Sequence, residues 1–96
     1  MANESFGFVA YRSRQQTTAL EVALKSQGMQ CSIINTPHEI GMGCGLSVRF
    51  NLADLAAVTA IVGRMKQTAL IGIYSASYQN GRLDFKPVSR TMRHCN

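Results

Sequence analysis

The 96-residue chain lacks the features that mark several common classes of protein. No apolar run approaches the roughly 18 residues of a membrane-spanning helix. Residues 1–5 are polar and lack the basic and apolar regions of a signal peptide. The three cysteines are odd in number and widely spaced, which argues against a disulfide framework and for a reducing compartment. We therefore expect a cytoplasmic protein without a membrane segment.

Motifs for common cofactors are also missing. The chain contains no Cys-x-x-Cys pair, so a soft-metal chaperone is disfavoured. It contains no Gly-x-Gly-x-x-Gly run, no Walker loop and no recognisable Ser/His/Asp arrangement. Because these motifs are absent, we expect neither a metal site nor a bound cofactor.

Negative charge is scarce, and the net charge of +5 is unevenly distributed. Residues 1–78 contain six Lys/Arg against four Asp/Glu, whereas residues 79–96 contain four Lys/Arg against Asp84 alone. A chain of this length forms one domain, which we place at residues 1–78, with a basic extension at residues 79–96. The extension is suited to an acidic partner, or is simply a solvated tail.

Hydrophobic periodicity predicts an α+β domain with the element order βαββαβ. The strands are expected at residues 6–12, 31–35, 46–50 and 70–75. The helices are expected between them, with Ser13 and Asn51 as N-caps and Gly28 at the end of the first helix. This order is typical of a ferredoxin-like sandwich, in which two helices cover one face of a four-stranded antiparallel sheet. The Asn80-Gly81 pair predicts that the chain then folds back as a short hairpin.

An RNA-binding domain of this kind would present exposed aromatic side chains on its central strands. The strand at residues 46–50 offers only Phe50, which lies on its apolar face. We therefore do not expect a nucleic-acid partner.

The residue best prepared for chemistry is Cys44, which lies between Gly43 and Gly45 in a loop that leads into a strand. A thiol reacts as the thiolate, which needs exposure and nearby donors or positive charge. Glycines allow several backbone amides to turn toward one sulfur atom. The segment at residues 36–45 is therefore a candidate reactive-thiol site, although a free cysteine also serves as a small core residue.

Four nearby residues are candidates for a supporting role. His38 and Glu39 precede the glycines and would act as an acid or base near the thiol. Arg49 lies on the face of its strand opposite Leu46, Val48 and Phe50, where it would reach an anionic group. Pro37 sets the direction of the loop. Exposed loop charges are also commonly solvated without a role.

The other two cysteines are weaker candidates. Cys31 alternates with Ile33 in its strand, which favours burial, and Cys95 follows His94 near the end of the chain. A redox-sensing thiol remains one interpretation, provided that Cys44 reaches Cys31 or Cys95.

The run Thr36-Pro37-x-Glu39-Ile40, followed by Cys44-Gly45-Leu46-x-x-Arg49-Phe50, resembles the signature of a small bacterial family of selenium/sulfur carrier proteins. The resemblance extends over residues 7–75. It implies that Cys44 carries the cargo and that Pro37, Glu39, Gly45 and Arg49 support it. His38 departs from the family pattern, in which a basic Arg or Lys is usual.

We therefore expect a carrier that holds sulfur or selenium on Cys44 as a persulfide or perselenide. The resemblance implies a donor enzyme like a cysteine desulfurase, and an acceptor protein. No convincing catalytic base accompanies Cys44, which favours a carrier over an independent enzyme. The alternative is a non-catalytic adaptor that uses the 36–45 loop and the basic tail to bind a partner or an anionic ligand. Association into a homodimer stays open.

Overall fold

The computed structural model describes residues 4–38, 40 and 45–88. Glu39, Gly43, Cys44 and the tail at residues 89–96 lie outside the described residues. Within the described part, the chain forms β1 (Glu4–Tyr11), α1 (Arg14–Ser26), β2 (Cys31–Asn35), β3 (Leu46–Phe50), the 3-10 turn η1 (Leu52–Asp54), α2 (Leu55–Met65), β4 (Leu70–Gln79) and β5 (Arg82–Pro87).

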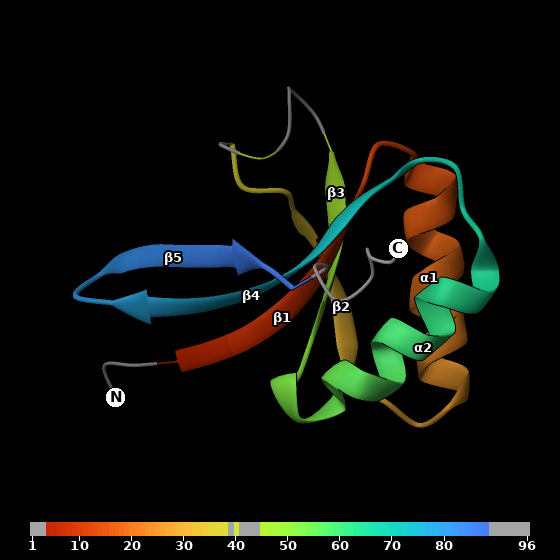
Figure 1. The fold of residues 1–96 in the computed structure, drawn as a ribbon, viewed down its shortest axis with the longest axis horizontal. Helices are drawn as coiled ribbons and strands as arrows, with labels where there is room; N and C mark the ends of the chain where they lie inside the picture. Colours follow the sequence, from red (N-terminus) through yellow and green to blue (C-terminus); the bar gives the residue numbers. More distant parts are fainter. Residues whose placement is uncertain (1–3, 39, 41–44, 89–96) are drawn as a thin grey trace.

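The strands form one antiparallel sheet in the order β2-β3-β1-β4-β5, and both helices lie on the same side of it (Figure 1). The predicted α+β class, antiparallel sheet and pair of helices are confirmed. The expected count of four strands is wrong, since the described part of the sheet has five.

The fifth strand arises from the fold-back predicted after β4. Asn80 and Gly81 both adopt positive φ values, 54° and 78°, as a tight hairpin turn requires. The turn pairs β5 with β4 from Gln79↔Arg82 to Tyr74↔Pro87. The hairpin extends away from the helices (Figure 1), so β5 forms an edge of the sheet.

Helix α1 begins and ends as its sequence predicts. The side chain of Ser13 accepts a hydrogen bond from the amide of Gln16 at 3.1 Å. Gly28 takes the left-handed conformation, φ 82°, that commonly ends a helix. The side chain of Gln16 does not complete a capping box, because its Oε1 instead accepts the amide of Ala69 at 2.9 Å. This bond ties the start of α1 to the segment that precedes β4.

Helix α2 begins later than predicted. Asn51 does not cap it, because η1 intervenes and the Asn51 side chain makes no capping hydrogen bond. The carbonyl of Asn51 instead accepts the amide of Asp54 at 2.8 Å, which closes the 3-10 turn. In the part of the chain that the structure describes, neither helix is both long and apolar enough to cross a membrane.

The main core lies between the helices and the sheet. Alternation along β1 directs Val9 and Tyr11 to the helices. They join a buried cluster that we call the helix-face cluster: Val9, Tyr11, Leu20, Leu24, Val48, Phe50, Val58, Val62 and Ile73. Gly7 lies beneath the ring of Phe50, where an added Cβ would come 2.4 Å from the ring. This face thus needs glycine at position 7.

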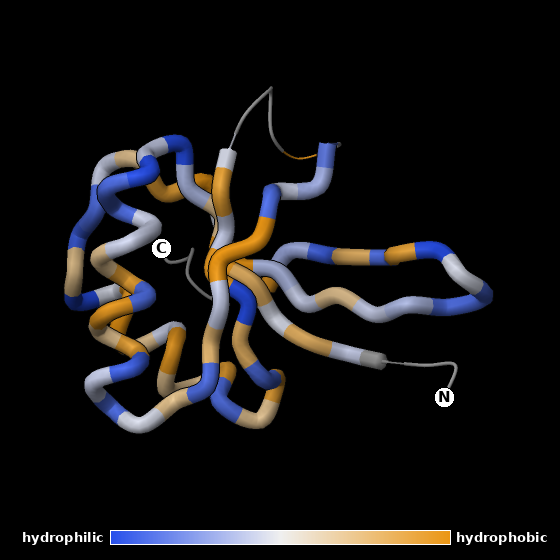
Figure 2. The backbone as a smooth tube through the Cα atoms, turned by 180° about the vertical axis from the view of Figure 1, so that it is seen from behind, coloured by the Kyte–Doolittle hydropathy of each residue, from blue (hydrophilic) through white to orange (hydrophobic). Residues whose placement is uncertain are grey.

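A second apolar cluster lies on the opposite face, which no helix covers in the described part of the chain (Figure 1). We call it the open-face cluster; Phe6, Phe8, Ala10 and Ala76 are its buried members, and Ile34, Ile40, Ile71, Tyr74, Leu83 and Phe85 pack against them. The rings of Phe8 and Tyr74 stack with centroids 5.1 Å apart. Figure 2 shows hydrophobic residues along the central strands and hydrophilic ones at the tip of the β4–β5 hairpin.

The open-face cluster contains aromatic residues, although the strand at residues 46–50 contributes none of them. Phe6 and Phe8 come from β1 and Tyr74 from β4, the two strands that pair with each other most extensively, and Phe85 comes from β5. Phe8 is fully buried and Phe6 is 4% exposed, so neither ring offers a free face for stacking on a base. The absence of a nucleic-acid partner stays a prediction.

Candidate functional site

The 36–45 loop joins β2 to β3 and is closed at its base by backbone pairing. Asn35 pairs with Leu46, and the amide of Thr36 donates to the carbonyl of Gly45 at 3.2 Å. Leu46 also pairs with Tyr11, the last residue of β1. The loop base therefore lies at the end of the sheet where β1 leads into α1.

Gly45 is tightly packed at this base. A Cβ on residue 45 would come 3.0 Å from the carbonyl oxygen of Tyr11 and 3.1 Å from Oγ1 of Thr36. Among the described glycines, the left-handed conformation occurs at Gly28 and Gly81 but not at Gly45. The sequence suggested glycine at position 45 for its conformational freedom. The structure indicates a different need for glycine, because the neighbouring chain approaches too closely for a side chain.

Two hydroxyl groups lie directly beneath the loop base. Oγ1 of Thr36 and Oγ of Ser47 are 2.8 Å apart, and Ser47 is fully buried. Sequence reasoning missed Ser47, because a serine that alternates with apolar residues in a strand is usually assigned to a solvated face. No sequence signal distinguishes it from the exposed Ser32 on β2.

The described residues inside the loop form a turn that packs against the open-face cluster. The amide of Ile40 donates to the carbonyl of Pro37 at 3.0 Å, and the side chain of Ile40 packs against that cluster. His38, between them, is exposed. The contact of Ile40 therefore places this residue of the loop on the face of the sheet that carries no helix. Glu39, Gly43 and Cys44 remain outside the described residues.

Arg49 lies on the open face as alternation predicts, but it lies some way from the loop base. Its guanidinium carbon is 4.1 Å from the ring centroid of Phe6. It is four residues along β3 from Gly45, which at about 3.3 Å per residue is roughly 13 Å. The structure therefore brings Gly45, Pro37 and His38 to one loop and places Arg49 farther along the same face.

Cys31 is half-buried at the opposite end of β2 from the loop. Its Sγ lies 3.7 Å from the carbonyl oxygen of Glu21, and it packs against the helix-face cluster. Burial raises the pKa of the Cys31 thiol, and the Glu21 carboxylate raises it further, against a smaller lowering by Lys25. This environment keeps the thiol protonated and fits the predicted packing role.

A polar network fixes the end of the sheet beside the loop. The hydroxyl of Tyr11 donates to Oε1 of Gln67, and Nε2 of Gln67 donates to the carbonyl of Gln16 at 3.3 Å. Desolvation by burial raises the pKa of Tyr11 to about 12. The network joins β1, α1 and the segment before β4, so the surface on which Gly45 rests is held from three elements.

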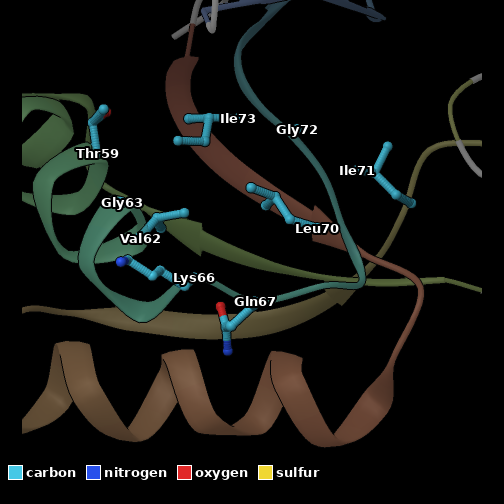
Figure 3. A pocket seen from close by; sticks show the side chains of 9 residues that line it. All are labelled: Thr59, Val62, Gly63, Lys66, Gln67, Leu70, Ile71, Gly72 and Ile73. Atoms are coloured by element: carbon cyan, nitrogen blue, oxygen red, sulfur yellow. The ribbon is translucent and has the colours of Figure 1, made fainter. Parts of the chain in front are cut away.

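A pocket of about 310 Å³ lies elsewhere, between α2 and β4. Figure 3 shows Val62, Leu70 and Ile73 around it, with Ile71 turned to the other side of the strand. None of the described site residues predicted from sequence lines this pocket. Among the described residues, no three His, Cys, Asp or Glu side chains gather where they would hold a metal ion.

The comparisons with known proteins point to one family. Residues 6–75 match the family model described as "Putative Se/S carrier protein-like", which covers most of the chain and includes the 36–45 loop. The chain matches no curated protein and no solved structure. Because the family match includes β1 through most of β4, the chain belongs to the Se/S carrier protein-like family.

Proposed function

We propose that this protein carries sulfur or selenium on Cys44, as a persulfide or perselenide, between a donor enzyme and an acceptor protein. The observation that supports it is the family match over residues 6–75, which includes the cysteine-bearing loop. In this proposal the fold is a ferredoxin-like domain extended by β5. The role of the fold is to present one loop at the end of a rigid sheet.

The described surroundings of the loop suit such a carrier. A cargo thiol has to be reached by two different partners, so it is best placed on a connection rather than within the core. The base of the loop is fixed by the Thr36–Gly45 backbone bond and by the contact of Gly45 with Tyr11. Ile40 anchors its middle on the open-face cluster. This arrangement fixes the base of the loop that bears the thiol.

The transfer step needs no external oxidant or reductant. The Cys44 thiolate attacks the outer sulfur of a persulfide on the donor, and the sulfur–sulfur bond of the donor breaks. The donor thiolate leaves, and Cys44 becomes the persulfide. Attack by an acceptor thiolate on the outer sulfur then repeats the step in the other direction, and the same balance holds for selenium.

The proposal assigns supporting roles to residues around the thiol. The amides of Gly43 and Gly45 would stabilise the anionic outer atom, because oriented N–H groups form an anion-binding concavity. Glu39 and the exposed His38 would handle protons at the loop. Arg49, which lies against Phe6 on the open face, would meet an anionic group of the cargo or of a partner.

Sulfur loading tests the proposal directly. The chain is incubated with a cysteine desulfurase and cysteine, and its intact mass is measured without reductant. We expect a gain of one sulfur atom in the wild type and in Cys31→Ser and Cys95→Ser, and none in Cys44→Ser. Absence of added sulfur in the wild type, or equal loading of Cys44→Ser, rejects a carrier role for Cys44.

One observation favours the adaptor alternative. Arg82 and Lys86 are exposed on the edge strand β5, with the exposed Asp84 between them, so the strand carries a net charge of +1. An adaptor would keep its partner in Cys44→Ala and lose it when the basic residues are neutralised. A carrier would instead lose loading in Cys44→Ala, so a pull-down and a loading assay on the same variants separate the two functions.

A further inference from the structure

We propose that two copies of this chain associate through β2, by antiparallel pairing of its free edge about a two-fold axis at Ile33. β2 forms one edge of the sheet and, in the part of the sheet that the structure describes, pairs with β3 alone. A free strand edge is a template for another strand, so folded proteins usually protect it. The pairing does not depend on what the 36–45 loop carries.

The two edges of the sheet differ in this protection. Exposed charged side chains line the edge strand β5: Arg82, Asp84 and Lys86. β5 also ends at Pro87, and both charges and proline are common on an edge that stays free. β2 has the sequence Cys-Ser-Ile-Ile-Asn, with no charged residue and no proline, and its register with β3 runs from Cys31 to Asn35 without a bulge. Of these two edges, β2 is therefore the one open to another strand.

The backbone of β2 presents a self-complementary set of groups along this edge. The amide of Thr36 donates to the carbonyl of Gly45 at 3.2 Å, at the position that follows Asn35 in the register. Since backbone groups alternate along an antiparallel strand, the amides and carbonyls of Cys31, Ile33 and Asn35 face away from β3. Pairing about Ile33 sets this residue opposite its own copy and Cys31 opposite Asn35. Each opposed pair would then exchange two hydrogen bonds, as in any antiparallel ladder.

Apolar side chains beside this edge favour a second copy as the partner. Ile33 is only half-buried and is a member of neither the helix-face cluster nor the open-face cluster. A two-fold axis perpendicular to the sheet would place the Ile33 side chains of the two copies against each other. The same axis keeps the helices of both copies on one side of the joined sheet. α1, which contacts β2, carries Val22, a residue that is 61% exposed and that this assembly would cover.

The direction of pairing keeps the two candidate loops apart. Each 36–45 loop follows Asn35, and antiparallel pairing sets the Asn35 residues of the two copies at opposite ends of the joined strands. Four residue steps at about 3.3 Å each separate these ends, which is roughly 13 Å along the strands. The assembly would therefore present one loop base at each end rather than a single shared site.

The test is the oligomeric state of the full chain in the presence of a reductant, which excludes disulfide-linked dimers. One pair of short strands buries less area than the roughly 1,200–2,000 Å² of a stable interface, so we expect a dimer that forms as concentration rises. Sedimentation velocity between about 10 µM and about 1 mM should show the average mass rising toward twice that of the chain. A wild-type chain that stays monomeric over this range overturns the proposal and leaves the edge to a strand of another protein.

Opposite charges at position 33 test the position of the axis. Ile33→Lys and Ile33→Glu each place like charges across it, so each variant alone should associate at least about tenfold more weakly than the wild type. An equal mixture of the two variants should associate again, because lysine then lies opposite glutamate. Asp84→Lys, which adds the same side chain to the other edge strand, is the matched control and should associate like the wild type.

A proline variant decides the question if the charged variants do not fold. Asn35→Pro removes an amide that faces away from β3, so the variant should keep the wild-type circular dichroism spectrum and lose the dimer. Wild-type association in Ile33→Lys or in folded Asn35→Pro overturns the pairing about Ile33, as does a mixture of folded charged variants that stays monomeric. Unfolding of Asn35→Pro would show that this amide is needed within the chain, and would overturn it as well.

Discussion

Gly45 rests against the carbonyl oxygen of Tyr11, so closely that a Cβ on residue 45 would come 3.0 Å from that oxygen. Tyr11 in turn is held by the hydrogen bond of its hydroxyl to Gln67. The base of the candidate loop is thus packed against a strand whose position is fixed from the helix side of the sheet.

Gly45→Ala should destabilise the protein, because the backbone atoms around the new methyl group have little room to move. Overpacking of this kind costs about 1–3 kcal/mol. We expect a lower urea midpoint with an unchanged slope. A free energy of unfolding equal to that of the wild type would show that the loop base accommodates the methyl group without loss of stability.

Gly63→Ala is the matched control for that substitution. Gly63 lies in α2, is exposed, and has no heavy atom within 4 Å of an added Cβ. Alanine favours a helix over glycine by about 1 kcal/mol. We therefore expect this variant to be more stable than the wild type, in contrast to Gly45→Ala.

Gly7→Ala should be more damaging, because its Cβ would come 2.4 Å from the Phe50 ring, which is 2% exposed. We expect a loss of about 3 kcal/mol in chemical unfolding. Phe50→Leu removes the ring that clashes, so the double variant should lose less than the sum of the two single losses. Additive losses would contradict the packing of Gly7 beneath Phe50.

Stability should fall at high pH through Tyr11. Burial raises the pKa of Tyr11 from 10.0 to about 12 in the folded chain. Between these values the unfolded chain has released the phenolic proton and the folded chain retains it, so the folded state loses stability as pH rises. Below pH 10 this contribution is fully present. Urea unfolding at pH 8 and pH 11 measures the total loss, to which Tyr74 and Cys31 also contribute because burial raises their pKa values too.

Tyr11→Phe should be less stable than the wild type at pH 8, because Oε1 of Gln67 loses its donor at a cost of about 1–3 kcal/mol. The difference in the free energy of unfolding between Tyr11→Phe and the wild type should be smaller at pH 11 than at pH 8. Tyr78→Phe, at a residue that is 38% exposed, is the control for removal of a tyrosine hydroxyl. A constant gap between Tyr11→Phe and the wild type would exclude Tyr11 as the titrating group.

Shortening the chain should show where the folded domain ends. The Phe85 ring lies edge-on to Phe8 and Tyr74, with centroids 6.2 Å and 6.1 Å away. A chain that ends at residue 79 loses this contact and should be destabilised by on the order of 3 kcal/mol. A chain that ends at Val88 retains β5 and this ring contact, and should be more stable than the chain that ends at residue 79. The boundary placed at residue 79 stays a prediction until this is measured.

The elements that could be predicted from sequence are those set by local rules. Ser13 and Gly28 delimit α1, and Asn80-Gly81 sets the hairpin, because capping and turn conformations depend on neighbouring residues. The extent of β4 and the place of β5 could not be predicted. Both depend on the open-face cluster, in which Phe8 and Phe85 meet from opposite ends of the chain.

In the candidate site, too, features set by local sequence could be predicted and features set by tertiary contacts could not. The motif around Gly45 was visible in sequence, but the reason for this glycine depends on Tyr11, 34 positions earlier in the chain. Arg49 was placed on the correct face by alternation, although its contact with Phe6 is a tertiary one. Ser47 escaped notice because periodicity cannot distinguish a serine that faces water from one covered by a loop.

The central claim, that Cys44 is the site that carries the cargo, is tested most directly by a labelled pulse and chase. Cysteine labelled with heavy sulfur is supplied through a desulfurase, and the persulfide is trapped by alkylation and mapped by peptide mass spectrometry. We predict heavy sulfur on the Cys44 peptide, and its loss when an acceptor thiol is added. Label on Cys31 or Cys95 but not on Cys44, or label that no acceptor removes, would contradict the account.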